Sequence, residues 1–296
     1  MNSASTSNWG LTPFRAADSP GRRALTWMRR NPTIVAGSSI LVFFVMVALF
    51  APWIAGDPLG FDPLNRLKRP SAEFWFGTDQ LGRDVFSRVV YGTRISLIVG
   101  ISVAAIATVI GLLIGVLCGY YRRVDEVVMR VMDGMMAIPA ILLAIALITL
   151  MKASLLIVIV AISIPEIPRV VRLVRSVVLT VRGLPYIEAA VSTGTRGLRI
   201  MSRHILPSTV APLIVQATYV CSAAVLTEAG LSFLGAGTPP EIPSWGNVIA
   251  TGRAYFQLAP WIIFFPGLML ALAVLAINLV GDGLRDSLDP RIARRL

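Results

Sequence analysis

Long apolar runs without charged residues constrain this chain more than any other feature. A helix that crosses a bilayer needs about 20 predominantly apolar residues, and the run at 34–54 meets that length without a single charge. Only 15% of the 296 residues are charged, whereas soluble domains carry about 25%. The sequence therefore predicts an all-α polytopic membrane protein.

The apolar runs predict six transmembrane helices, at 34–54, 95–121, 134–151, 153–171, 205–227 and 260–281. They define a permease-like membrane domain at 34–281, between cytoplasmic tails at 1–33 and 282–296. The run inside 153–171 is the shortest, and it spans a bilayer only when it is extended through Glu166.

Small residues and a proline predict how two of these helices pack and bend. Gly111, Gly115 and Gly119 share one helix face, which permits close contact with a neighbouring helix. Pro139 is expected to kink the third span.

The basic residues predict the orientation. With the N-terminus in the cytoplasm, 19 Lys and Arg residues lie in cytoplasmic segments and 7 in outer ones. This bias predicts that both termini are inside (N-in/C-in) and that the loop at 172–207 is cytoplasmic. Orientation also accounts for the net charge of +11, so a nucleic-acid partner is not expected.

The chain lacks the residues that common enzyme sites need. Its lysines, Lys68 and Lys152, do not belong to a phosphate-binding loop of the G-x-x-x-x-G-K-[ST] type. His204 is the only histidine, and Cys118 and Cys221 lie inside apolar runs. The sequence therefore predicts no catalytic residue, metal site or cofactor in this chain, and any ATP would be bound by another subunit.

Three acidic residues near the spans have alternative interpretations. Glu166 could be a substrate or proton site inside the membrane, but Arg169 lies three residues on, which favours a salt bridge between them at a membrane boundary. Asp133 is expected to cap the start of the third span. Glu228 could lie equally at the outer surface or in a polar cavity. The absence of a row of buried carboxylates counts against a proton-coupled carrier.

The outer segment at 56–92 carries mixed charges at helical spacing. Asp79, Arg83, Asp84 and Arg88 predict a solvated or interfacial helix with pairs at i and i+4.

The central loop predicts a short helix. Pro185 and Tyr186 can begin it, and Glu188, Ala189 and Ala190 can continue it. The small side chains of the two alanines would let a partner approach the backbone closely. Such a helix across the base of the membrane domain could transmit a push as a rigid body, although an ordinary interfacial loop helix remains the alternative.

Residues that follow this helix predict a turn and the start of the next span. Gly194 and Gly197 permit the turn, and Leu206–Pro207 begins the span.

These residues resemble the EAA loop of permease subunits of bacterial ABC importers. The loop's general pattern has Ile where this chain has His204, and the version here, RHILP, looks like that of the dipeptide/oligopeptide group. Three other stretches look like the same group: GTDQLGRD at 77–84, LSFLG at 231–235 and NLVGDGLRDSLDPR at 278–291. The chain is most similar to the second, DppC/OppC-type permease subunit.

The resemblance implies a type I ABC importer permease fold in the bacterial cytoplasmic (inner) membrane. It also implies a heterodimer with a homologous second permease, two nucleotide-binding ATPase subunits that hold ATP and Mg, and an extracytoplasmic peptide-binding protein, with membrane lipid around the spans. The expected cargo is a di- or oligopeptide. The residues expected to couple the chain to the ATPases are Tyr186, Glu188, Ala189, Ala190, Gly194, Leu206 and Pro207.

Three other functions stay open at this point. The same family also contains importers of nickel or another small solute. A different class would be an ion-coupled secondary transporter, and a third alternative is a membrane scaffold without transport.

Overall fold

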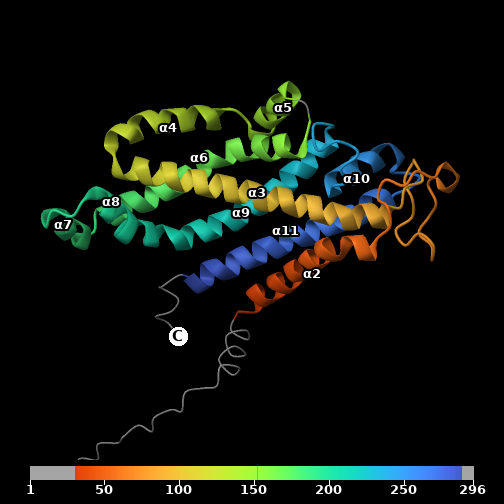
Figure 1. The fold of residues 1–296 in the computed structure, drawn as a ribbon, viewed down its shortest axis with the longest axis horizontal. Coiled ribbons are helices and arrows are strands. Elements are labelled where there is room, and N and C mark those ends of the chain that lie inside the picture. The colour runs from red at the N-terminus through yellow and green to blue at the C-terminus, as the bar shows by residue number, and fades with distance from the viewer. Residues whose placement is uncertain (1–30, 152, 289–296) are drawn as a thin grey trace, which may run out of the picture.

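The structure is a computed structural model that describes residues 31–151 and 153–288. Lys152 and most of both predicted tails lie outside the described residues. Long helices lie side by side along one direction (Figure 1). The longer helices are α2 (Pro32–Ile54), α3 (Val85–Tyr120), α4 (Arg122–Ala137), α5 (Ala140–Leu150), α6 (Leu155–Arg182), α9 (Leu206–Phe233) and α11 (Trp261–Leu288). The shorter ones are α7 (Pro185–Ser192), α8 (Gly197–Ile200) and α10 (Trp245–Gly252), with η1 (Pro63–Asn65), η2 (Met201–Ile205, a π-helix) and η3 (Arg253–Tyr255).

Four of these helical segments are long and apolar enough to cross a membrane: α2, α3, α11 and the stretch Gly197–Phe233 that contains α9. A fifth is present if the bent pair α4–α5 is one span. The α6 helix is just as long but carries Glu166, Arg169 and Arg172 in its middle. The expected all-α membrane fold class is confirmed, since the described residues contain no strand beyond one isolated bridge.

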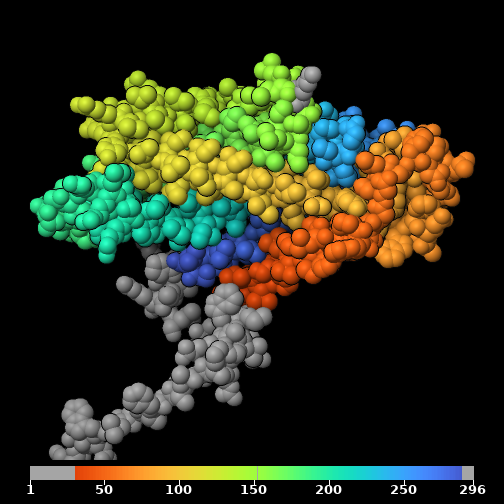
Figure 2. Space-filling view, in the orientation of Figure 1, coloured from red at the N-terminus to blue at the C-terminus, as the bar shows by residue number. Residues whose placement is uncertain are grey.

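The two ends of the bundle differ. One end, here called the α7 end, carries α7 and α8, and the start of α2 and the end of α11 face toward it (Figure 1). The opposite end, here called the α10 end, carries α10 and a cap of residues 55–84. In the space-filling view this cap covers the tip of the bundle (Figure 2).

The predicted i,i+4 pair of Asp79 and Arg83 is present in the cap. The predicted solvated helix is wrong, because these charges are buried. Asp79 is fully buried and accepts from Arg83 Nε and Arg88 Nη1, each at 2.7 Å. Two cations on one carboxylate offset the cost of burying it. Asp84 instead caps α3, because its side chain accepts from the backbone N–H groups of Phe86 and Ser87. The helix therefore begins ten residues before the predicted span.

The third predicted span is broken rather than kinked. α4 and α5 meet at an angle of 88°, and Pro139 lies just before α5. Asp133 does not start a helix, so its predicted capping role is wrong: it lies in the last part of α4 and accepts from Arg172 Nη2 of α6 at 2.6 Å.

The predicted glycine face is confirmed as the contact between α3 and α6. A Cβ on Gly111, Gly115 or Gly119 would lie 2.5–2.7 Å from the Cβ of a valine on α6. Atoms of separate residues do not approach that closely, so only glycine allows the two helices to pack at this distance. The valines are Val170, Val174 and Val178.

The α6 helix passes without a break through Pro165 and Pro168 and ends only at Arg182. It therefore takes in the first part of the predicted loop at 172–207. Neighbouring helices can satisfy the backbone groups that a proline frees, which makes such continuity possible in a membrane helix. The predicted Glu166–Arg169 pair is confirmed, with 2.8 Å between Oε1 and Nη1.

Glu228 lies in a buried polar cluster, so the alternative at the outer surface is wrong. Its Oε1 accepts from Ser232 Oγ at 2.8 Å and from Ser244 Oγ at 2.7 Å. Ser244 also caps α10 through the N–H of Asn247. The cluster thereby ties α9 to the start of α10.

Candidate functional site

The α7 helix carries most of the predicted coupling residues and projects beyond the ends of α2 and α11 (Figure 1). Pro185 begins it, where the missing N–H costs nothing. Ile187 is buried in the main core of the bundle and anchors the helix. Tyr186, Glu188 and Ala189 are exposed on its other sides. The predicted short helix therefore exists and presents its small and acidic residues outward.

Gly194 ends this segment in a conformation that favours glycine. Its φ is +79°, in the left-handed region. Its N–H donates to Val191 O at 2.9 Å, and Thr195 N–H donates to Ala190 O at 3.1 Å. These bonds satisfy carbonyl groups at the end of α7 and reverse the chain there.

The chain then returns to the bundle through buried residues. Ile200, Met201 and Ile205 pack in the core that anchors α7. Leu206 and Pro207 form the first turn of α9, as predicted, and both are exposed. The loop is therefore anchored on both sides of its exposed tip.

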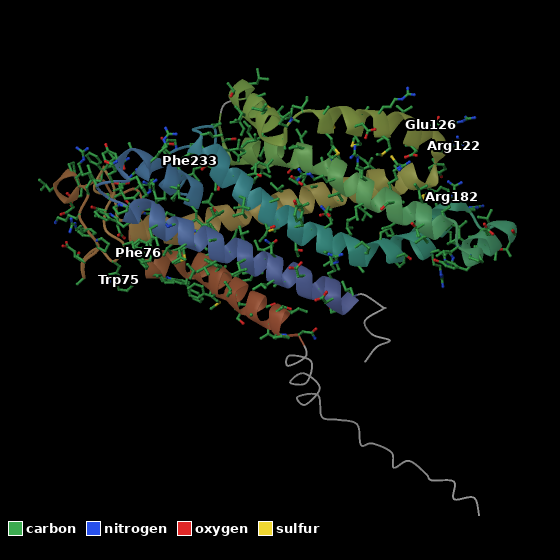
Figure 3. All side chains as sticks on the ribbon, turned by 180° about the vertical axis from the view of Figure 1, so that it is seen from behind. Trp75, Phe76, Arg122, Glu126, Arg182 and Phe233 are labelled. Atoms are coloured by element: carbon green, nitrogen blue, oxygen red, sulfur yellow. The ribbon has the colours of Figure 1, made fainter. Side chains whose placement is uncertain are left out.

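Tyr120, at the end of α3, contacts both α8 and Arg182 at the end of α6. A Cβ on Gly197 would be 3.0 Å from Tyr120 Oη, so α8 lies directly against the tyrosine ring. Arg182 Nη1 donates to Tyr120 O at 2.9 Å, and its guanidinium lies 5.7 Å above the ring. Figure 3 shows Arg182 at this end of the bundle. The ends of α3 and α6 thus hold the base of α7.

The exposed tip combines apolar and basic side chains. Its exposed apolar residues are Leu184, Tyr186, Val191 and Leu198, and its exposed arginines are Arg196, Arg199 and Arg203. Figure 2 shows this end as a projecting knob. Exposed apolar side chains with a polar rim are typical of a protein-contact surface.

Two ion pairs that the sequence analysis missed join α4 to α6 near this surface. Arg175 binds Asp125 through both of its guanidinium nitrogens Nε and Nη2, the latter at 2.6 Å. Arg172, which lies one turn before Arg175 on α6, binds Asp133. The spacing of the two arginines along one helix face could have indicated a partner helix, but partners 39 and 50 residues away in sequence carry no local signal.

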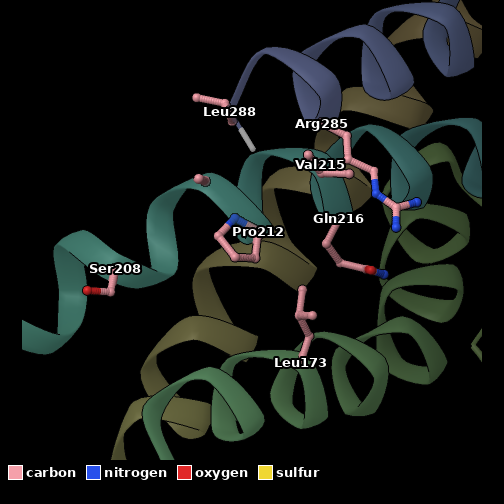
Figure 4. Close-up of a pocket in the computed structure, with 8 residues that line it drawn as sticks. Leu173, Ser208, Pro212, Val215, Gln216, Arg285 and Leu288 are labelled. Atoms are coloured by element: carbon pink, nitrogen blue, oxygen red, sulfur yellow. The ribbon is translucent and has the colours of Figure 1, made fainter. Parts of the chain in front are cut away.

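A hollow between α6, α9 and α11 is the second feature that the sequence analysis did not find. We call it the α6–α9–α11 hollow (Figure 4). Its volume is about 630 Å³, and it is lined by Leu173, Ser208, Ala211, Pro212, Val215, Gln216, Arg285 and Leu288.

The described residues hold no group of three or more His, Cys, Asp or Glu side chains that could bind a metal ion. Cys118 and Cys221 are both free.

Family models match most of the chain. Residues 107–294 match the model of the binding-protein-dependent transport system inner membrane component. Residues 19–70 match that of the N-terminal transmembrane domain of oligopeptide transport permease C.

Relatives match over nearly the full length. A protein of Sinorhizobium fredii named as a probable peptide ABC transporter permease is 57% identical, over 96% of this chain and 99% of its own. The dipeptide transport system permease protein of Alkalihalophilus pseudofirmus is 43% identical, over 93% of this chain and 91% of its own. A solved structure of the MetNI methionine ABC transporter, in an inward-facing conformation, covers 68% of this chain and 96% of its own at 22% identity, with a TM-score of 0.55. That match supports the fold.

Proposed function

The chain belongs to the family of binding-protein-dependent transport system inner membrane components, and from this membership we propose that it is a permease subunit of an ATP-driven importer of di- or oligopeptides. The family is one of multi-pass proteins in the bacterial inner membrane. The relatives reported above are named for peptides or dipeptides, which gives nickel import and ion coupling no support.

The exposed α7 helix is the observation that carries the coupling part of the proposal. It is short and held at its base by Ile187, while Glu188 and Ala189 point outward. A helix anchored in this way moves with the bundle rather than independently of it. A partner that pushes on α7 would therefore shift α3 and α6, which fits a rigid-body switch between two membrane states.

The proposed coupling residues are those of the predicted EAA loop. Tyr186, Glu188, Ala189 and Ala190 lie on α7, and Gly194 ends it. Leu206 and Pro207 have a different position, at the start of α9. We assign the first five to contact with an ATPase subunit, and Leu206–Pro207 to setting the direction in which the chain re-enters the membrane domain.

The proposed orientation places the α7 end in the cytoplasm with both termini. The arginines of the loop at 172–207 and the basic tails at 1–33 and 282–296 support this orientation through the positive-inside rule. The membrane domain at 34–281 then has its cap and α10 on the outer side.

The proposed complex has four further components. Two nucleotide-binding subunits, with ATP and Mg, contact the α7 end, and hydrolysis takes place there rather than in this chain. A homologous second permease completes the membrane part, and an extracytoplasmic binding protein delivers the peptide to the α10 end.

Reconstitution tests this function directly. The chain, the permease and ATPase subunits that co-purify with it and the binding protein would be placed in proteoliposomes, and uptake of a radiolabelled dipeptide would be followed. We expect uptake only with ATP and only with the binding protein. Uptake driven by an ion gradient without ATPase subunits would overturn the proposal.

A further inference from the structure

The α6–α9–α11 hollow has the size of a ligand site. It adjoins a second hollow of about 220 Å³ that shares Val215, Gln216 and Arg285 with it. The volume of the larger part lies within the range of roughly 300–1,000 Å³ that small-molecule sites occupy. The two parts together form an open groove along α9 and α11.

Contacts between α11 and α2 show how deep this groove lies. A Cβ on Gly283 would be 2.2 Å from Ile34 Cγ1, so these two residues are level. Ile34 begins the uncharged run of α2 and therefore marks the edge of the apolar layer. At 3.6 residues a turn, Arg285 lies just beyond this edge and Asn278 lies more than a turn inside it.

The groove is polar at the edge of the apolar layer and just inside it. Asn278, Asp282 and Arg285 follow one another at i, i+4 and i+7, on one face of α11, and all three line the groove and are exposed. Gln216 contributes its amide from α9 near the edge, because a Cβ on Gly281 would be 2.3 Å from Thr218 Oγ1. Of these residues Asn278 lies deepest, and a polar side chain at membrane depth faces water or a polar partner rather than acyl chains.

Leu173 is the α6 residue that lines the groove. Glu166 and Arg169 are not part of the lining, but they precede Leu173 by seven and four residues, hence on the same helix face and deeper in the bundle. Glu166 is 5% exposed, and its Oε2 has no hydrogen-bond partner among the described residues. A buried ionisable group in a membrane helix commonly marks a substrate pathway.

The charges of the groove are available to a ligand. Asp282 and Arg285 form no ion pair within the described part of the chain, where the ion pairs lie elsewhere. One anion and one cation on successive turns of α11 complement a zwitterion, whereas a cluster of cations would suit an anionic lipid head group. A short peptide has a cationic and an anionic terminus with amide groups between them.

We propose that the groove binds the peptide substrate at the point where the peptide leaves the membrane domain toward the cytoplasm. Arg285 pairs with the C-terminal carboxylate and Asp282 with the N-terminal ammonium group, while Gln216 and Asn278 bond to the peptide group between them. This inference rests on the proposed function, because it takes its ligand class from peptide import.

Cysteine labelling in the complete complex tests whether the groove holds water. Asn278→Cys and Ala36→Cys would be made in a Cys118→Ala, Cys221→Ala background and treated with a charged thiol reagent in inside-out vesicles. Ala36 is the matched control, because it is exposed on α2 beside Gly37, whose Cβ would be 2.9 Å from Leu279 Cβ, so the two positions lie at similar depth. We expect Asn278→Cys to react about tenfold faster. Equal rates would overturn the proposal, since the groove would then be no more open to water than the outer face of α2.

Protection by dialanine tests whether a peptide is the ligand. Dialanine should slow the labelling of Asn278→Cys, whereas N-acetyl-dialanine amide, which lacks both terminal charges, should not. Arg285→Gln should raise the dialanine concentration needed for half-protection about tenfold. Protection by the uncharged analogue alone, or by anionic lipid instead of dialanine, would overturn the zwitterion site.

Uptake by the unmodified complex separates this inference from the proposed function. ATP-driven dialanine uptake without protection at position 278 would overturn the groove site and leave peptide import standing. If the ATPase is active but no di- or oligopeptide enters, peptide import itself fails and the groove site fails with it.

Discussion

Arg175 of α6 and Asp125 of α4 form a two-point ion pair that joins the broken helix α4–α5 to the helix that leads into α7. The pair is partly buried, with the aspartate side chain 16% exposed. Because the two guanidinium bonds fix direction as well as distance, a displacement of α6 would carry α4 with it. The pair thus links the proposed coupling surface to the membrane segment that bends by 88°.

Asp125→Asn should loosen this link. Removing the charge should weaken both bonds and destabilise the chain by about 1–2 kcal/mol, since the pair is only partly shielded from water. The measurement is the Tm of the solubilised complex together with peptide-stimulated ATPase activity, both of which should fall. Glu126→Gln is the control, because its pair with Arg122 is exposed (Figure 3). Equal effects of the two variants would contradict a specific role for Asp125.

Glu188→Lys should uncouple the ATPase subunits while the chain still inserts into the membrane. Glu188 is exposed on α7, so reversing its charge disturbs a partner rather than the core of this chain. ATP-driven uptake should fall by about tenfold or more, which corresponds to ~1.4 kcal/mol of contact energy. Co-purification of the ATPase subunits and the amount of chain in the membrane would be measured together.

The control for this charge reversal is Glu126→Lys, an exposed acidic residue on α4 whose side chain pairs with Arg122. Normal uptake by Glu188→Lys, or equal losses in both variants, would argue against a coupling role for α7.

Gly194→Ala should distort the end of α7. A Cβ there would meet no atom within 4 Å, so the alanine side chain has enough space. The obstacle is the φ of +79°, because an L-residue in the left-handed region carries backbone strain of about 1 kcal/mol. Gly183→Ala is the matched control, because it lies at the other end of α7 with φ −82°. Coupled ATPase activity should fall for Gly194→Ala alone, and Gly194→Asn should restore part of it. Equal activity of both alanine variants would show that the turn does not matter.

Local patterns predicted the parts of this fold that depend on neighbours in sequence. The glycine face of α3 indicated close packing because it required only helical periodicity and the absence of side chains. The short helix at α7 followed from Pro185 and the small residues after it. The i and i+3 pair of Glu166 and Arg169 was predictable for the same reason.

Long-range pairing and burial decided the parts that sequence reasoning missed. Asp133 was interpreted as a cap because Arg172, its partner, lies 39 residues away. Asp79 was interpreted as solvated because its spacing from Arg83 predicts a pair but does not show that the pair is buried together with Arg88. The break at Pro139 was underestimated as a kink, since a proline indicates where a helix bends but not by how much.

Asp79→Ala should destabilise the cap more than any exposed change in it. The carboxylate is fully buried and is the partner of both Arg83 and Arg88, so its loss leaves two largely buried cations together. Removing one partner from a buried ion pair costs about 3–5 kcal/mol, which should lower the Tm of the complex strongly or prevent its assembly. Glu73→Ala, at an exposed position of the same cap, should change stability by less than about 0.5 kcal/mol. A Tm for Asp79→Ala close to that of Glu73→Ala would mean that water or a partner reaches the two arginines, and that the cap is held by its apolar contacts instead.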